Sequence, residues 1–212
     1  MLFRSPSNRY GGINFAALNK ESGCRAAFTS RFGDDGFLMN LDFDGYHIRL
    51  LAYLVNYDFP TQNSVHEYLG KIYFNKTTLT PEEYDQSKKV SFKLLYGGIT
   101  KEYLHVEFFK RVHELTKLLW KQFNEQNYIE TPLFNRKLYK NFFSEMNASK
   151  LLNYYLQCFE TERNCLVLDK LNQIVCKSKI ILYTYDSLLI DFNKADGRSE
   201  EHTSELQSRE TI

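Results

Sequence analysis

Three aspartates stand where strand-like segments give way to turns. Asp42 and Asp44 close an apolar run at residues 37–43, and Asp186 lies between two apolar runs at residues 179–192. If these strands are neighbours in one sheet, Asp42 and Asp186 converge at its edge, where paired carboxylates repel unless a cation lies between them. Mg²⁺ accepts one or two carboxylates and completes its shell with water and phosphate oxygens. The alternative is an ordinary turn, because aspartate is a common turn residue.

A lysine lies within an aromatic stripe in residues 78–98. The stripe repeats every fourth position, as Tyr84, Lys88, Phe92 and Tyr96. Residues four apart share one face of a helix. In one interpretation Lys88 is a surface residue whose stem lies along the rings. In the other, its ammonium group binds a phosphate while the ring faces hold a base or a sugar.

The ends of the helix that carries this stripe are well marked. Thr80 is a natural N-cap, Pro81 suits the first helical position, and Glu83 completes a capping box. Gly97 and Gly98 end the helix. The sequence therefore predicts a helix over residues 81–97.

The remaining hydrophobic pattern predicts further helices and strands that position these groups. Residues 1–35 are predicted to be loop with short extended pieces. The pattern then predicts a buried strand at 37–43, a helix after Gly45 that Pro60 closes, a helix at 65–74, an amphipathic helix at 101–127, a hairpin or loop at 129–139, a helix from about 147 to about 175, and a β-hairpin at 179–192.

The composition is that of a globular chain. Its 212 residues are 43% hydrophobic and 25% charged, and a net charge of +1 gives no reason by itself to expect nucleic acid. The four cysteines form no C-x-x-C pair, so a zinc site or a disulfide framework is not expected, and a cytosol-like compartment fits. No apolar run reaches transmembrane length and no signal peptide is evident. We therefore expect a cytoplasmic protein without membrane contact.

Residues 198–212 differ from the rest of the chain. They contain no aromatic residue and no apolar period, and the stretch RSEEHTSELQS resembles the translation of a common sequencing-library adapter. We interpret them as a disordered, artefactual tail and exclude them from the fold. Removing their two Arg and four Glu raises the net charge from +1 to +3.

The order of these features resembles the palm and fingers of a family A (DNA polymerase I-like) DNA polymerase, most similar to phage or other viral members. DFDGYHIRLLAYL, which starts at Asp42, resembles motif A, D-x-S-x-x-E-x-R. KKVSFKLLYGG at 88–98 resembles motif B, K-x-x-x-F-x-x-x-Y-G, and YDS at 185–187 resembles motif C, H-D-E. Weaker matches are RAAF at 25–28, ETPLFNRKL at 130–138 and NYYLQ at 153–157. The resemblance covers residues 1–195.

The resemblance implies a role for each matching residue. Asp42 and Asp186 would bind two Mg²⁺ ions, with the main-chain carbonyl of Phe43 as a further ligand. Lys88 would contact the incoming triphosphate and protonate the departing pyrophosphate. Phe92 would pack against the nucleotide, Tyr96 would stack near the templating base, and His47 would face the sugar. The residues implied to contact the primer–template duplex are Arg25, Arg136, Asn153 and Gln157.

Several positions depart from the family motifs. His47 stands where the family has a glutamate that helps exclude ribonucleotides, and its imidazole is bulky enough to crowd a 2′-hydroxyl. Tyr84 replaces an arginine that binds the triphosphate, which removes one cation. Tyr185 and Ser187 replace the His and Glu of motif C. Asp44 falls on the serine of motif A, and we interpret it as a supporting or turn residue.

Together these features predict an α+β fold with a polymerase palm, whose antiparallel sheet carries two catalytic aspartates, and helical fingers. Residues 1–60 would form the first part of the palm, 61–128 the fingers and 129–197 the second part of the palm, without thumb or exonuclease domain. The expected function is a template-directed DNA polymerase fragment that transfers dNTPs to a primer 3′-hydroxyl on a DNA primer–template. The alternatives are a catalytically impaired nucleic-acid-binding remnant, a single-subunit RNA polymerase-like enzyme and a metal-free structural domain.

Overall fold

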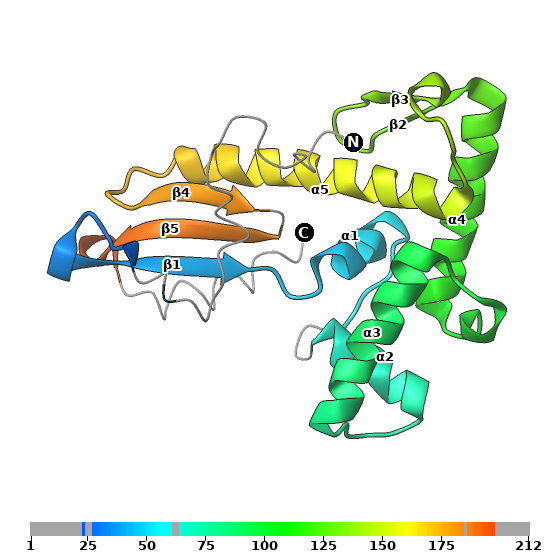
Figure 1. Cartoon of the computed structure of the whole chain (residues 1–212), viewed down its shortest axis with the longest axis horizontal. Coiled ribbons are helices and arrows are strands. Elements are labelled where there is room, and N and C mark those ends of the chain that lie inside the picture. Colours follow the sequence, from blue (N-terminus) through cyan, green and yellow to red (C-terminus); the bar gives the residue numbers. More distant parts are fainter. Residues whose placement is uncertain (1–22, 24–26, 61–63, 185, 198–212) are drawn as a thin grey trace. The chain divides into compact units, whose positions relative to one another are not determined.

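The computed structural model describes residues 23, 27–60, 64–184 and 186–197, which belong to two compact units (Figure 1). The sheet unit comprises Met1–Asp42 and Val175–Ile212, and the helical unit comprises Phe43–Ile174. Their boundaries differ from the predicted subdomain boundaries at 60 and 128, so the assignment of palm and fingers stays a prediction. The predicted tail at 198–212 lies outside the described residues.

The sheet unit is built on three antiparallel strands in the order β1-β5-β4 (Figure 1). These strands are β1 (Gly36–Asp42), β4 (Lys179–Thr184) and β5 (Ser187–Asn193). The strand predicted at 37–43 and the hairpin predicted at 179–192 are therefore confirmed. Short 3₁₀ helices lie beside the strands, η3 (Gly33–Asp35) before β1 and η6 (Lys194–Asp196) after β5.

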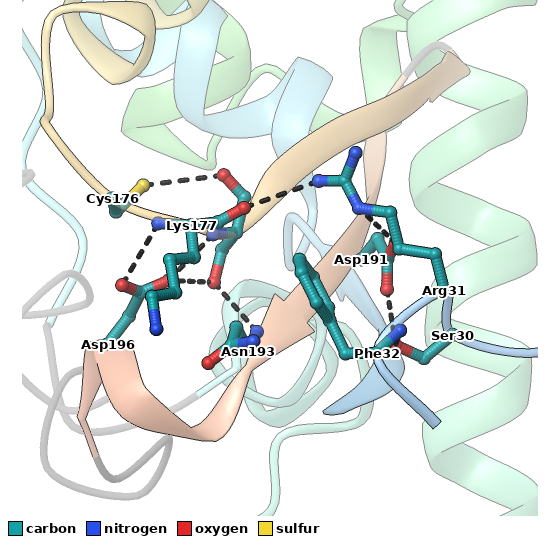
Figure 2. Close-up of polar contacts among 9 residues, drawn as sticks. Ser30, Arg31, Phe32, Cys176, Lys177, Asp191, Asn193 and Asp196 are labelled. Carbon is teal, nitrogen blue, oxygen red and sulfur yellow. Dashed lines mark hydrogen bonds and ion pairs between the residues drawn. The ribbon is translucent and has the colours of Figure 1, made fainter. Parts of the chain in front are cut away.

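Polar contacts hold the end of the sheet where β5 finishes (Figure 2). Asp191 is buried. It accepts a hydrogen bond from Ser30 Oγ at 2.6 Å and forms an ion pair with Arg31 Nε at 3.2 Å. Asp196 accepts hydrogen bonds from the Ser178 hydroxyl and main-chain N–H. These hydrogen bonds, with one from the Lys177 N–H, hold the pKa of the Asp196 carboxyl below its usual range.

The described residues of the helical unit form five α-helices, two short 3₁₀ helices and one short hairpin (Figure 1). Its elements are α1 (Tyr46–Leu54), α2 (Val65–Phe74), α3 (Pro81–Gly97), η4 (Lys101–Tyr103), α4 (Glu107–Gln126), β2 (Tyr128–Glu130), β3 (Lys137–Tyr139), η5 (Lys140–Phe142) and α5 (Ala148–Asn172). The helix predicted at 65–74 and the hairpin predicted within 129–139 are confirmed. Helix α5 begins and ends within a few residues of the prediction.

The helices pack around a core of large apolar side chains. Four phenylalanines are almost completely buried, namely Phe108, Phe109, Phe123 and Phe159. Helix α5 contacts α1, α3 and α4, and α2 contacts α3. By contrast, Leu188 is the only fully buried apolar residue in the described part of the sheet unit. The main hydrophobic core therefore lies in the helical unit, where it determines how the helices meet.

The signals that end α3 act as the sequence predicts. The Thr80 hydroxyl accepts a hydrogen bond from the Glu83 N–H, and the Glu83 carboxylate accepts one from the Thr80 N–H at 3.0 Å. Pro81 occupies the first helical position, and Gly98, with φ of 102°, follows the last turn. Helix α3 lies close to α2, because a Cβ on Gly70 would come within 2.8 Å of Ser87 Cβ.

Two helix ends differ from the prediction. Helix α1 ends at Leu54, well before Pro60, because Asn56 adopts φ of 50° and the Tyr57 N–H bonds to the Ala52 carbonyl. This is a Schellman motif, in which asparagine takes the left-handed position. Helix α4 begins at Glu107 rather than at residue 101, because Val106 is buried in an extended conformation. None of the described helices combines the length and the hydropathy that a membrane span requires.

Candidate functional site

The sheet brings Asp42 and Asp186 to the same end of the sheet unit. Asp42 is the last residue of β1 and lies opposite Ser187, the first residue of β5. Thr184 also lies opposite Ser187, so β4 and β5 are joined by a two-residue turn that contains Asp186. Opposed residues in an antiparallel pair have Cα atoms about 5 Å apart, and the Cα atom of Asp186 is about 3.8 Å from that of its neighbour Ser187.

These two carboxylates are a suitable donor set for Mg²⁺. Both aspartates are exposed, so their oxygens can reach solvent and a phosphate. Within the described ranges, no group of three or more His, Cys, Asp or Glu side chains could hold a metal by itself. Mg²⁺ is commonly held by one or two carboxylates together with water and substrate phosphates. An ion at this end of the sheet would complete its shell with oxygens from water or from a phosphate.

The residues after Asp42 form a tight turn into α1. Gly45 adopts φ of 57°, and a Cβ at this position would lie 2.2 Å from Val65 Cγ2. The Asp44 carboxylate pairs with Arg49 at 3.3 Å and accepts a hydrogen bond from Ser64 Oγ. This geometry agrees with the interpretation of Asp44 as a turn residue. The carbonyl of Phe43, predicted as a metal ligand, belongs to the first residue of the helical unit.

Helix α3 presents the predicted aromatic and basic stripe on its exposed side. Phe92 and Tyr96 are 43% and 41% exposed, and their rings stack with centroids 6.0 Å apart. The Lys88 ammonium group lies 4.3 Å from the centre of the Tyr84 ring and 4.0 Å from an Asp85 oxygen. The stripe thus offers exposed ring faces and a cation on one side of α3.

Tyr84, the residue at the predicted position of the motif B arginine, places its ring against Lys88. The Tyr84 hydroxyl is within hydrogen-bond distance of Ser64 Oγ, at 3.2 Å. Nearby, His66 is buried and its ring lies 5.4 Å from that of Phe92. Burial lowers the pKa of His66, Asp44 raises it and Lys88 lowers it further. Lys88 is the cation that lies against the Tyr84 ring on the described part of α3.

His47 lies between two hydrogen-bonding partners from different helices. Its Nδ1 is 2.7 Å from the Tyr96 hydroxyl, and its Nε2 is 2.8 Å from Glu160 Oε2. The structure thus brings together His47 and Tyr96, two predicted nucleotide-binding residues. It adds Glu160, a residue of α5 that the sequence analysis did not select.

The predicted DNA-binding residues differ in their surroundings. Arg25 lies outside the described residues, and Gln157 is exposed on α5. Asn153, one turn before Gln157, donates a hydrogen bond to the Tyr96 carbonyl at 3.1 Å. Asn153 therefore secures the end of α3, a role that the spacing of motif residues did not suggest.

Arg136 is held by a second buried carboxylate, Glu162. The Arg136 Nε lies 3.0 Å from Glu162 Oε1, while half of the arginine side chain stays exposed. Glu162 also accepts hydrogen bonds from the Thr131 hydroxyl and from the N–H groups of Leu133 and Phe134. One carboxylate thus organises the whole loop between β2 and β3.

The sequence analysis missed two residues of the site, Glu160 and Glu162, which both lie on α5. Glu160 and Glu162 are 6% and 1% exposed, although ionisable residues are rarely so buried unless they are paired. The sequence could have pointed to these two glutamates because they lie at positions of the helical pattern that are otherwise apolar. Their partners come from segments far away in the sequence, so the pattern alone could not name them.

The fold can be compared with known proteins. No protein-family model and no curated protein matches the sequence. A solved structure, the POL domain of Pol1 from M. smegmatis in complex with DNA primer-template and dNTP, is similar in fold, with a TM-score of 0.65 and 20% sequence identity. The match covers 91% of this chain and 39% of that chain. The predicted polymerase-like α+β fold is therefore confirmed, and this chain corresponds to less than half of that protein's length.

Proposed function

We propose that this chain carries the nucleotidyl-transfer site of a template-directed, family A DNA polymerase of the phage or viral type. The observation that supports the proposal most directly is the position of Asp42 and Asp186 at one end of one antiparallel sheet, in a chain with the fold of a polymerase domain. The proposed substrates are dNTPs and a DNA primer–template. A cytoplasmic location also stays a prediction.

The proposed chemistry assigns one task to each group. Asp42, Asp186 and the Phe43 carbonyl would hold Mg²⁺, which would supply positive charge to the reacting phosphate oxygens. Lys88 binds the triphosphate and donates a proton to the departing pyrophosphate. Phe92 and Tyr96 hold the nucleotide through their ring faces, and His47 contacts its sugar. The primer 3′-hydroxyl attacks the α-phosphate, forming a P–O bond as the bond to pyrophosphate breaks.

Primer extension tests the proposed reaction. The 212-residue chain is incubated with a primer–template, Mg²⁺ and either dNTPs or NTPs. We expect template-directed incorporation of dNTPs, and we expect Asp186→Asn to slow it strongly without a change in circular dichroism. Preference for NTPs would instead indicate an RNA polymerase. Incorporation at the wild-type rate in the Asp186→Asn variant would contradict the role of this carboxylate.

Metal binding can be tested without any activity. Mn²⁺ replaces Mg²⁺ in oxygen sites and broadens the NMR signals of nearby nuclei. We expect low concentrations of Mn²⁺ to broaden the amide signals of Leu41 and Ser187, which flank the two aspartates, before those of Asp191 at the other end of β5. The effect should disappear in the Asp42→Asn variant. Uniform broadening along β5 would contradict a metal site at this end of the sheet.

A nucleic-acid-binding protein without catalytic activity is the second candidate. It is favoured by Tyr84 in the position of the motif B arginine and by the pairing of Lys88 with Asp85 at 4.0 Å, both of which reduce the charge available for a triphosphate. This protein would bind the primer–template without extending it. Equal affinity of the wild type and the Asp186→Asn variant for DNA, together with no extension by either, would favour it.

A further inference from the structure

A buried carboxylate on α5 controls a contact between three helices. His47 comes from α1, Tyr96 from α3 and Glu160 from α5. The side chains of His47 and Glu160 are 17% and 8% exposed, and their N–O distance is 2.8 Å. Because a carboxylate is rarely buried without a partner, the pairing with His47 explains how Glu160 is tolerated inside the helical unit.

The chemistry of the three groups determines which of them donates and which accepts each hydrogen bond. An ionised carboxylate only accepts hydrogen bonds, so in the form with Glu160 ionised and His47 neutral, Nε2 of His47 carries the proton shared with Glu160. In a neutral imidazole, Nδ1 is then an acceptor. It receives its hydrogen bond from the Tyr96 hydroxyl at 2.7 Å. Glu160 thus determines both the tautomer of His47 and the direction of the Tyr96 hydroxyl.

Helix α5 holds Tyr96 at a second point as well. The Asn153 side chain donates a hydrogen bond to the Tyr96 carbonyl at 3.1 Å. Asn153 and Glu160 are seven residues apart and therefore lie on the same face of α5. Helix α5 thus holds the main chain of Tyr96 directly and its hydroxyl through His47, and the Phe92 ring stacks on Tyr96.

We propose that Glu160 is a positioning residue that sets sugar selectivity through His47. This inference rests on the proposed polymerase function. Motif A of the family has its own carboxylate at the position of His47, whereas here the carboxylate comes from α5 and acts through the imidazole. Glu160 holds the ring of His47 against Tyr96, so that the bulk of the imidazole stays where the nucleotide sugar would lie. Without Glu160 the ring can rotate, and a 2′-hydroxyl is no longer excluded.

The main test combines Glu160→Gln with two independent measurements. The amide keeps the shape of the side chain but can donate as well as accept a hydrogen bond. We expect the ¹⁵N NMR signals of the His47 ring to change from a single Nε2–H tautomer in the wild type to a mixture. We also expect the ratio of kcat/KM for dNTPs to that for NTPs to fall about tenfold or more, the scale of a hydrogen bond to a charged group.

Two further variants make the test specific. Asp169→Asn neutralises an exposed carboxylate on the same helix, one that accepts a hydrogen bond from Gln173, and should change neither measurement. Tyr96→Phe keeps the ring and leaves the His47–Glu160 pair intact. It should reduce sugar selectivity while the Nε2–H tautomer persists, and it serves as the readout if Glu160→Gln does not fold.

The outcomes separate this inference from the proposed function. A single unchanged tautomer in Glu160→Gln would overturn the positioning role. A mixed tautomer with an unchanged dNTP to NTP ratio, in an active enzyme, would overturn the role in selectivity. If the wild type extends no primer with any nucleotide, the polymerase function and its selectivity fail, and the tautomer measurement alone then decides whether Glu160 positions His47.

Discussion

The sheet end with Asp42 and Asp186 and the three-helix contact of His47, Tyr96 and Glu160 are built in opposite ways. At the sheet end, both carboxylates are exposed and are positioned by strand register and a two-residue turn. In the three-helix contact, the side chains of His47 and Glu160 are mostly buried, and all three side chains are positioned by the packing of α1, α3 and α5. The sheet end depends on backbone hydrogen bonds between strands, and the three-helix contact depends on side-chain partners from different helices.

This difference indicates how each region responds to substitution. An exposed carboxylate can be neutralised at little cost in stability, because water replaces its contacts. A buried carboxylate leaves its partners without hydrogen bonds when it is removed, so the fold and the position of its neighbours change together. We therefore expect loss of function without unfolding at the sheet end, and loss of stability around the buried glutamates.

The largest effect is expected from neutralising the aspartates at the sheet end. If both carboxylates bind metal at one site, Asp42→Asn and Asp186→Asn should each lower the rate of primer extension about 10³-fold. This is the scale of the loss of a group that stabilises the transition state. The double variant should lose little more, because the residues act as a unit. Stability in urea should change by less than about 0.5 kcal/mol. Multiplied losses in the double variant would show that the aspartates act in separate steps.

The largest loss of stability is expected from removing Glu162. Glu162→Ala leaves Thr131, the Leu133 and Phe134 N–H groups and Arg136 without their shared acceptor. Breaking such a buried pair costs about 3–5 kcal/mol, which urea unfolding would measure. The control is Glu145→Ala, which removes an exposed carboxylate and should cost less than about 0.5 kcal/mol. If the two substitutions lower the free energy of unfolding equally, the burial of Glu162 does not make it more important for stability than an exposed carboxylate.

A smaller effect is expected at the N-terminus of α3. Thr80→Ala removes the hydroxyl that accepts the Glu83 N–H and should lower the free energy of unfolding by about 1 kcal/mol. Thr77→Ala is the matched control, because Thr77 is exposed in the preceding loop. Urea unfolding of both variants measures the difference. If the two substitutions cost the same, the capping box does not stabilise the helix that carries Lys88.

The smallest effect is expected from the titration of His66. Burial holds the pKa of His66 below its ordinary value of 6.5, so the unfolded chain takes up the proton first as the pH falls. The stability of the wild type should therefore be full above pH 6.5 and decrease below it. His66→Gln cannot titrate and should lose less stability between pH 7.5 and pH 5.5 in urea unfolding. Parallel curves for the two proteins would show that His66 does not contribute.

Local structure was largely predictable, because its signals lie within a few residues of one another. Thr80 and Glu83 are close enough to cap α3, and the turn that carries Asp186 is set by the two strands beside it. The end of α1 was mispredicted because Asn56, in the left-handed conformation, ends the helix before the chain reaches Pro60. The start of α4 was mispredicted because the burial of Val106 depends on the packed core.

The amino-acid sequence alone was thus sufficient to predict most helices and strands. Its motif spacing and family resemblance also selected Asp42, Lys88 and Asp186 as candidate site residues. Strand pairing was needed to bring Asp42 opposite Ser187, because backbone hydrogen bonds between distant segments set the register. Side-chain packing was needed to pair His47 with Glu160 and Arg136 with Glu162. Those pairs form because burial makes an unpaired charge costly, and only the folded chain determines which groups are buried together.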